Sequence, residues 1–171
     1  MITKWDERFM RLAKEISTWS KDPSRQIGAI TVDESRRILS TGYNGFPSRL
    51  NDTTDRLNDR EQKYKYIVHA EMNCIYNACQ NGISLNGAKL YVWGLPVCSE
   101  CAKGVIQVGI SEVYCGHNND NEYHSSIWKE SFETTKAMFA EADIAVHEIF
   151  IEPIPKLLVI SESDSHVGGC C

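Results

Sequence analysis

Two short motifs in the chain combine side chains that bind metal ions with a carboxylate that can move protons. The first is His69-Ala70-Glu71, and the second is the pair Cys98 and Cys101, which are three residues apart. Cysteines at this spacing on a helix lie on one face, so both sulfurs can reach one ion. A helix N-terminus also favours their thiolate forms, because its unpaired N–H groups carry partial positive charge. We expect His69 to supply a third ligand.

Three protein ligands leave the fourth position of a tetrahedral zinc ion open, which is typical of a catalytic site. A fourth ligand of the kind found in structural zinc sites is not evident nearby in the sequence. The closest candidate is Cys74, which lies more than one turn further along the same predicted helix. Zinc lowers the pKa of a bound water to about 7, and a carboxylate within reach can accept and return the proton. Residues two apart in a helix point roughly 200° away from each other. We therefore expect the motif where the chain enters the helix, with Glu71 directed at the water.

Neither motif is specific by itself. A His-x-Glu triplet occurs by chance, and a Cys-x-x-Cys pair in a cytosolic protein can be a redox pair or half of a structural zinc site. The combination of both motifs, each at a helix start with a strand between them, favours catalytic zinc. We predict that Cys74, Cys79 and Cys115 are packing residues, and that Cys170 and Cys171 form an exposed, flexible pair.

The elements that must position these motifs follow from hydrophobic periodicity. Apolar residues recur at helical spacing from Trp5 to Ile16, and a hairpin is expected from strands 28–32 and 38–43. Residues 44–65 form a long loop in which we expect function and some local helix. Further helices are predicted over 69–80, 98–107 and 127–141, the first with Met72, Ile75, Tyr76 and Cys79 on one side, and strands over 89–93, 111–115 and 144–149. Strands alternating with helices predict parallel β-α-β units of an α/β fold, with both helix starts at the carboxyl ends of the strands.

Composition limits the class of protein. The 171 residues are 42% apolar, enough for one domain with a sizeable core; we assign residues 1–152 to it and 153–171 to a loosely ordered tail. The sequence contains no apolar run long enough to span a membrane and starts without a signal peptide, so we expect a cytoplasmic protein. A net charge of −5 disfavours polynucleotide binding but leaves room for a single nucleotide. Seven cysteines, an odd number, cannot all pair within one chain.

His-x-Glu followed by Cys-x-x-Cys is the signature of zinc-dependent nucleobase deaminases, and the sequence resembles that superfamily from about Trp5 to Ile149. Within it, the chain is most similar to the deoxycytidylate (dCMP) deaminase family. The narrower likeness rests on the segments Asp22-Pro23-Ser24-Arg25, Gly42-Tyr43-Asn44-Gly45-Phe46-Pro47, Val68-His69-Ala70-Glu71-Met72-Asn73 and Cys98-Ser99-Glu100-Cys101-Ala102-Lys103. One departure is Val97, where the family has proline directly before the first zinc cysteine; a small change of loop shape is expected there.

The resemblance implies a three-layer α/β/α fold around a mixed five-stranded sheet. It implies one Zn²⁺ per subunit, bound by His69, Cys98 and Cys101, with Glu71 as the catalytic acid and base. The reaction would convert dCMP to dUMP and ammonia, supplying dUMP for thymidylate synthesis. The implied substrate contacts are Arg25 and Tyr123 with the 5′-phosphate, Asn44 with the sugar, and the Ala70 N–H with the base carbonyl.

The family resemblance further implies a homo-hexamer activated by dCTP and inhibited by dTTP, both with Mg²⁺. Gly42, Tyr43, Asn44 and Gly45 resemble part of that effector site, and Trp128 fits either a subunit contact or the core. Two alternatives stay open from the sequence. One is a deaminase acting on another cytosine nucleoside or nucleotide, or on RNA, and the other is a zinc-binding module without catalysis.

Overall fold

The computed structural model describes residues 1–117 and 126–151, so Tyr123 and the predicted tail 153–171 lie outside the described residues. Five strands form one mixed sheet in the order β2-β1-β3-β4-β5. Strand β1 pairs antiparallel with both β2 and β3, whereas β3, β4 and β5 are parallel. The strands are β1 (Gly28–Val32), β2 (Ile38–Tyr43), β3 (Lys89–Trp93), β4 (Glu112–Gly116) and β5 (Ala145–Ile149). The predicted hairpin and parallel units are confirmed.

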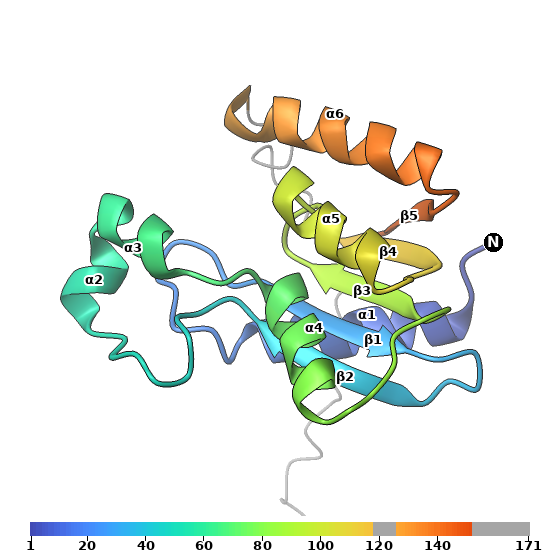
Figure 1. The fold of residues 1–171 in the computed structure, drawn as a ribbon, viewed down its shortest axis with the longest axis horizontal. Helices are drawn as coiled ribbons and strands as arrows, with labels where there is room; N and C mark the ends of the chain where they lie inside the picture. The colour runs from blue at the N-terminus through green and yellow to red at the C-terminus, as the bar shows by residue number, and fades with distance from the viewer. Residues whose placement is uncertain (118–125, 152–171) are drawn as a thin grey trace, which may run out of the picture.

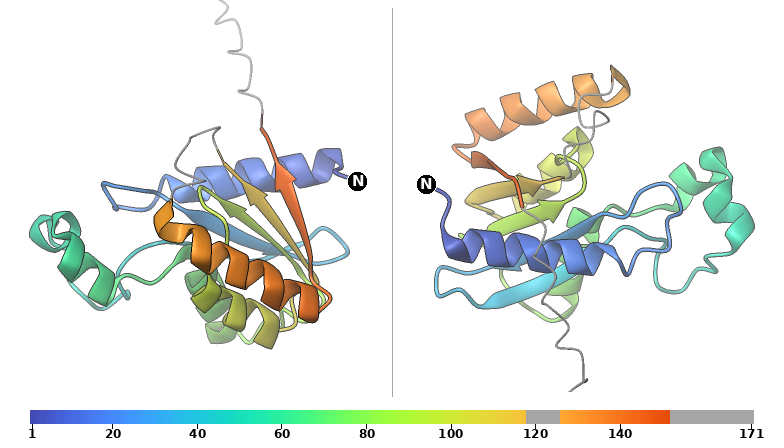
Figure 2. Two further views of the ribbon diagram at one scale, coloured as in Figure 1. Left: turned by 90° about the horizontal axis from the view of Figure 1, so that it is seen from above. Right: turned by 180° about the vertical axis from the view of Figure 1, so that it is seen from behind.

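Helices cover both faces of the sheet in the predicted three-layer arrangement (Figures 1 and 2). Helix α1 packs on one face, and α4, α5 and α6 pack on the other. A separate pair, α2 and α3, projects from the body within the long loop after β2 (Figure 1); we call residues 54–66 the α2–α3 lobe. The helices are α1 (Lys4–Ser17), α2 (Thr54–Asn58), α3 (Arg60–Tyr66), α4 (Ala70–Gln80), α5 (Ser99–Gln107) and α6 (Ser126–Glu141).

Strand β3 lies between the two halves of the hydrophobic core. Leu90 and Val92 face α4, α5 and α6, whereas Tyr91 and Trp93 face α1. Successive side chains of a strand point to opposite faces, so a central strand covered on both sides reads as a continuous apolar run. This explains why the sequence Leu-Tyr-Val-Trp has no polar alternation.

The inner face of α4 differs from the prediction. The residues it buries are Ala70, Glu71, Cys74, Ile75 and Ala78. Tyr76 and Cys79 are exposed, so the prediction that Cys79 is a packing residue is wrong. The helix packs small residues closely against the sheet and turns its larger Tyr76 outward. Among the described residues, no helix is long and apolar enough to cross a membrane.

Candidate active site

His69 and Cys98 are the N-caps of two neighbouring helices. His69 precedes α4 with φ −70° and ψ 157°, and Cys98 precedes α5 with φ −78° and ψ 163°. Helix α4 leads into β3 and β3 leads into α5, so the start of α4 and the start of α5 lie together where β3 ends (Figure 1). The extended backbone at His69 lets its ring and the Glu71 side chain approach one point, as predicted for a motif at a helix entrance.

His69, Cys98 and Cys101 have the geometry of a metal centre. Their ligand atoms all lie within 4.8 Å of one another. His69 Nδ1 is 3.4 Å from the Sγ of Cys98 and 3.4 Å from the Sγ of Cys101. Tetrahedral zinc with ordinary Zn–S and Zn–N bonds would separate such atoms by about 3.5 Å. These side chains therefore fit one zinc ion, and they are the only such cluster in residues 1–117 and 126–151.

Hydrogen bonds within this cluster shift the pKa values of its side chains. Hydrogen bonding to Cys98 raises the pKa of His69 to about 8. Hydrogen bonds from Cys101 and His69 lower the pKa of Cys98 to about 4, against the effect of burial. The same contact with Cys98, together with burial, raises the pKa of Cys101. These contacts favour the thiolate form of Cys98, which is the form that binds zinc.

Glu71 is a buried carboxyl group beside these ligands. Its residue is only 3% exposed, and it lines the same pocket as His69 and Cys98. Burial raises the pKa of Glu71 to about 7, although the charge of His69 opposes the shift. A carboxyl group whose pKa is near neutrality can both accept and donate a proton. Glu71 therefore lies in the pocket with a pKa that suits the acid–base role expected of it from the sequence.

A glycine sets the position of α4. A Cβ atom on Gly42 of β2 would lie 2.5 Å from the Ala70 carbonyl oxygen and 2.3 Å from the Cys74 backbone nitrogen. Only a residue without a side chain allows β2 and α4 to approach this closely. Gly42 therefore helps fix the first turn of α4, which carries Ala70 and Glu71. Ala70 is fully buried and lines the pocket, and its N–H belongs to the turn that has no intrahelical acceptors.

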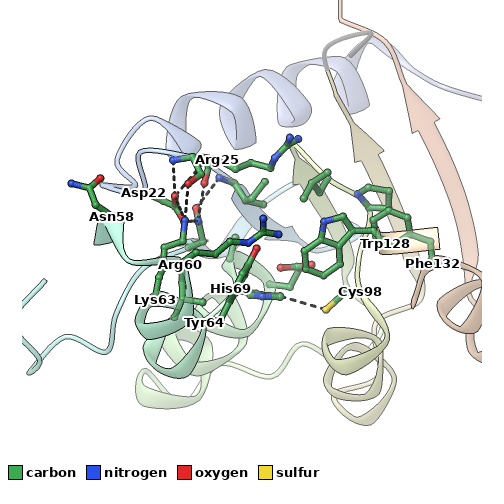
Figure 3. A pocket seen from close by; sticks show the side chains of 18 residues that line it. Asp22, Arg25, Asn58, Arg60, Lys63, Tyr64, His69, Cys98, Trp128 and Phe132 are labelled. Atoms are coloured by element: carbon green, nitrogen blue, oxygen red, sulfur yellow. Dashed lines mark hydrogen bonds and ion pairs between the residues drawn. The ribbon is translucent and has the colours of Figure 1, made fainter. Parts of the chain in front are cut away.

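The metal cluster opens into a pocket of about 400 Å³ (Figure 3). It brings together His69, Ala70, Glu71, Cys98, Arg25 and Asn44, all predicted as site residues. Cys101 completes the cluster beneath the surface and is 2% exposed. Tyr123 lies outside the described residues. Sequence reasoning missed the other lining residues: Asp22, Ser24, Ile27, Asn58, Arg60, Lys63, Tyr64, Ile67, Leu95, Pro96, Trp128 and Phe132.

Asn44 is buried and holds the pocket wall together. Its Oδ1 accepts from the Ile27 N–H at 2.8 Å, and its Nδ2 donates to the Arg25 carbonyl oxygen at 2.9 Å. Nδ2 also lies 3.4 Å from Oδ2 of Asp22. The amide protons are thus directed at the chain, which leaves the second lone pair of Oδ1 for a ligand hydroxyl donor.

A buried ion pair lies beside Asn44. Lys63 Nζ donates to Asp22 Oδ1 and to Ser24 Oγ, both at 2.8 Å. The same Asp22 oxygen accepts from the backbone N–H groups of Ser24 and Arg25 at 2.8 and 3.2 Å. Asp22 and Ser24 belong to one of the segments that carried the resemblance, but Lys63, in the α2–α3 lobe, had no signal beyond its place in a long polar loop.

The opposite wall comes from α6. Trp128 and Phe132 line the pocket with nearly parallel rings, 6.4 Å apart between centroids. Helix α6 contacts the start of α5, because Ser131 Oγ accepts a hydrogen bond from the Ser99 N–H at 2.9 Å. Aromatic side chains facing a few polar groups are typical of a small-molecule site. Trp128 thus lines the pocket, a place that neither of its sequence-based interpretations included.

The predicted effector residues make local structural contacts. The Tyr43 carbonyl oxygen accepts from Asn73 Nδ2 at 2.8 Å, and the Tyr43 ring is partly exposed against Trp19. Gly45 exchanges backbone hydrogen bonds with Val68, directly before the metal-binding motif. These contacts connect the segment to the start of α4.

Val97 occupies the position where proline was expected. It is 1% exposed, and its backbone N–H contacts the buried sulfur of Cys115. Proline has no N–H to donate, so this contact depends on the departure from the family pattern. Burial raises the pKa of Cys115 to about 12, and that of Cys74 to about 11, which keeps both thiols neutral. Both are the packing residues that the sequence predicted.

Comparison with known sequences gives a consistent result. Residues 3–117 match the family model described as the cytidine and deoxycytidylate deaminase zinc-binding region. A protein of Aliivibrio fischeri described as an uncharacterized deaminase is 39% identical over 146 residues, which is 85% of this chain and 94% of that protein. The human deoxycytidylate deaminase is 33% identical over 165 residues, covering 94% of this chain and 87% of the human one.

Comparison with solved structures agrees at the level of the fold. The dCMP deaminase of cyanophage S-TIM5, solved in complex with dCMP and dUMP, superposes with a TM-score of 0.67. The match covers 87% of this chain and 99% of the phage protein, at 22% sequence identity. The likeness therefore shows that the two chains share an architecture.

Proposed function

The chain belongs to the cytidine and deoxycytidylate deaminase zinc-binding family, and on that premise we propose that it hydrolyses dCMP to dUMP and ammonia. The observation that carries the proposal is the meeting of His69, Cys98 and Cys101 with the buried Glu71 at one end of a pocket. Support for the substrate comes from the deoxycytidylate deaminase relatives and from the cationic side chains at the pocket wall, Arg25 among them.

In this proposal one zinc ion is held by His69, Cys98 and Cys101, and when bound it supplies an acidified water molecule. Glu71 takes a proton from that water and donates it to N3 of the cytosine ring as the water oxygen bonds to C4. It then takes the second proton from the new C4 hydroxyl and donates it to the amine, which leaves as ammonia when the C4–N bond breaks. Its pKa of about 7 suits both directions of transfer. The Ala70 N–H donates to the base carbonyl, and Trp128 packs against the ring.

The remaining substrate contacts concern the sugar and the phosphate. Asn44 accepts from the sugar hydroxyl through the free lone pair of Oδ1, and Arg25 binds two oxygens of the 5′-phosphate, the geometry that a guanidinium favours. Tyr123 adds a second phosphate contact. Residues 1–152 form the catalytic domain, with residues 153–171 as a tail.

The wider proposal concerns assembly and regulation. The chain forms a homo-hexamer in the cytoplasm and supplies dUMP for thymidylate synthesis. Its activity responds to dCTP as activator and dTTP as inhibitor, each with Mg²⁺, through the segment Gly42, Tyr43, Asn44 and Gly45. The support is the likeness of this segment to the family pattern and its contact with Val68 beside the metal motif. A velocity against dCMP that ignores both triphosphates would refute the regulatory part.

The central test is ammonia release by the purified protein, with the zinc content measured on the same sample. Cytidine, deoxycytidine, dCMP, dCTP and an adenosine-containing RNA are compared side by side, and dCMP is expected to be the best substrate. Glu71→Gln is expected to lower turnover about 10²- to 10⁴-fold, the usual contribution of general acid–base catalysis, and to retain one zinc. Cys79→Ser is the matched control, since Cys79 is an exposed residue of the same helix.

Three outcomes would contradict parts of this function. If dCMP is not deaminated but another cytosine compound is, the substrate assignment is wrong. If Glu71→Gln keeps full turnover, or loses its zinc, the role of Glu71 as a proton carrier is wrong. A protein that binds zinc but releases no ammonia from any of these compounds would be a binding module.

A further inference from the structure

Arg60 lies at the first position of α3 and lines the same pocket as the metal ligands. We propose that Arg60 binds the 5′-phosphate of the substrate together with Arg25, and that it selects a nucleotide over the corresponding nucleoside. This inference rests on the proposed function, because it assigns a specificity residue to that same site. No motif in the sequence singled out Arg60, which lies in the α2–α3 lobe.

Among the cations of the pocket wall, Lys63 is neutralised by a buried carboxylate. Lys63 is the third cation of that wall, but it is 4% exposed and its ammonium group bonds to Asp22 and Ser24. The Asp22 carboxylate is matched by Lys63, so the pair contributes little net charge. The guanidinium of Arg60 adds positive charge to a wall that also carries Arg25, which suits the charge of a phosphate monoester at neutral pH.

The Arg60 side chain is positioned by an aromatic ring and not by an ion pair with a described carboxylate. In residues 1–117 and 126–151, no acidic side chain forms an ion pair with Arg60; its guanidinium carbon lies over the Tyr64 ring, 5.4 Å from the centroid. Arg60 and Tyr64 are one helical turn apart, a spacing that brings side chains into contact. Stacking on the ring restricts the guanidinium and leaves its N–H groups, which point outward in the guanidinium plane, able to bind phosphate oxygens.

A single carboxylate connects the segments that carry the two arginines. Asp22 Oδ1 accepts from the backbone N–H of Arg25 and from Lys63, which lies three residues after Arg60 on α3. The buried ion pair therefore fixes α3 against the segment before β1. Figure 3 shows the Arg25 and Arg60 side chains extending into the pocket from these two segments. This arrangement gives the site two rigidly related donors for one phosphate.

The experiment compares Arg60→Gln with Arg56→Gln. Arg56 is the matched control, because it lies in the same lobe and stacks on Tyr66 at 5.1 Å but does not line the pocket. For each protein the ratio of kcat/KM for dCMP to kcat/KM for deoxycytidine is measured. Loss of charge-assisted hydrogen bonds should lower this ratio about 10- to 100-fold in Arg60→Gln, mainly through KM. Arg56→Gln should keep the wild-type ratio, and Arg60→Lys should recover part of it.

Binding of the product measures the same contact without turnover. Calorimetric titration measures the affinities for dUMP and for deoxyuridine. Arg60→Gln should lower the affinity for dUMP by the same factor, and it should therefore reduce the ratio of the dUMP affinity to the deoxyuridine affinity. Unchanged dUMP affinity and an unchanged substrate ratio in Arg60→Gln would overturn the role of Arg60. Wild-type protein that binds dUMP through Arg60 but releases no ammonia from dCMP would instead refute the proposed function alone. Zinc content and circular dichroism of each variant establish that it is folded.

Discussion

Asp22 and Lys63 place opposite charges inside the protein, where neither charge is well hydrated. Both side chains are at most 6% exposed, and the two groups are 2.8 Å apart. The pair persists because each partner has further hydrogen bonds, Lys63 to Ser24 and Asp22 to two backbone N–H groups. Removing one partner leaves the other charge buried and uncompensated, which costs much more than the net value of the pair.

We expect Lys63→Met to lower the free energy of unfolding by about 3–5 kcal/mol, the usual cost of breaking a buried pair. The double variant Asp22→Asn with Lys63→Met should recover most of that loss, because asparagine keeps the Oδ1 acceptor for the Ser24 and Arg25 N–H groups without the charge. Urea denaturation of the zinc-loaded proteins measures both effects.

Lys65→Met is the control for this prediction. Lys65 belongs to the same helix and pairs with Glu61, but both side chains are more than half exposed. Exposed pairs contribute about 0–1 kcal/mol, so a small change is expected. A double variant that is as unstable as the sum of its single variants would show that the charge of Asp22 is not what destabilises Lys63→Met.

The candidate site residues lie at the starts of helices, so the position of each helix start matters for activity. Strand β2 sets the position of α4 through Gly42. The Gly42→Ala variant tests this contact. The added Cβ would meet backbone atoms of Ala70 and Cys74 at 2.5 Å or less, so α4 must move rather than a side chain rotate. We expect the free energy of unfolding to fall by about 1–3 kcal/mol, as for other overpacked positions. Turnover should also fall, because Glu71 shifts with the helix.

Gly45→Ala serves as the comparison, since its Cβ would meet only Tyr43 Cε2, at an ordinary 3.8 Å. Thermal unfolding, zinc content and ammonia release are measured on both variants. If Gly42→Ala unfolds at the wild-type temperature and keeps its turnover, the close approach of β2 and α4 does not position the site.

Local patterns in the sequence were sufficient to predict the elements that carry the candidate metal ligands. The strand boundaries at Gly28–Val32, Ile38–Tyr43 and Lys89–Trp93 agree with the prediction, because alternation and flanking turn residues act over a few positions. His69 and Cys98 were correctly placed at helix starts, since a helix cap is a local event. The fourth and fifth strands and the last helix differ only by a residue at their ends.

The α2–α3 lobe and the inner face of α4 needed information that no local window holds. Lys63 and Arg60 look like solvated charges, and the ion pair of Lys63 spans 41 residues of sequence. The α4 error has the same origin. Periodicity placed Tyr76 and Cys79 inward, but the close approach at Gly42 favours the face with Ala70, Cys74 and Ala78. Long-range packing therefore decided both features.

The molecule as a whole has two apolar layers, one on each face of the sheet, and they differ in how many helices cover them. Three helices cover one face of the sheet, whereas within the described residues α1 covers the other. Asp6 links α1 to the central strand, because its Oδ1 accepts from the Tyr91 hydroxyl at 2.7 Å and its Oδ2 accepts from the Thr3 N–H at 2.7 Å. Tyr91 in turn stacks on Tyr114, which stacks on His147. The stability of this layer therefore depends in part on a carboxylate, in addition to the apolar packing of α1 on the strands.

That dependence predicts how stability changes with acid. Burial alone would raise the pKa of Asp6, but hydrogen bonds from Thr3 and Tyr91 outweigh it, and the folded pKa lies below 3.8. A lowered folded pKa means that the contribution is fully present above the unfolded pKa and is lost as the pH falls through the folded pKa. Asp6→Asn should therefore be less stable than the wild type by about 1–3 kcal/mol at pH 7, and this difference should shrink below about pH 4. Urea unfolding at pH 7, 5, 4 and 3 measures it, with Glu7→Gln, the exposed neighbour, as control. A difference that stays constant down to pH 3 would mean that the Asp6 charge does not join α1 to the sheet.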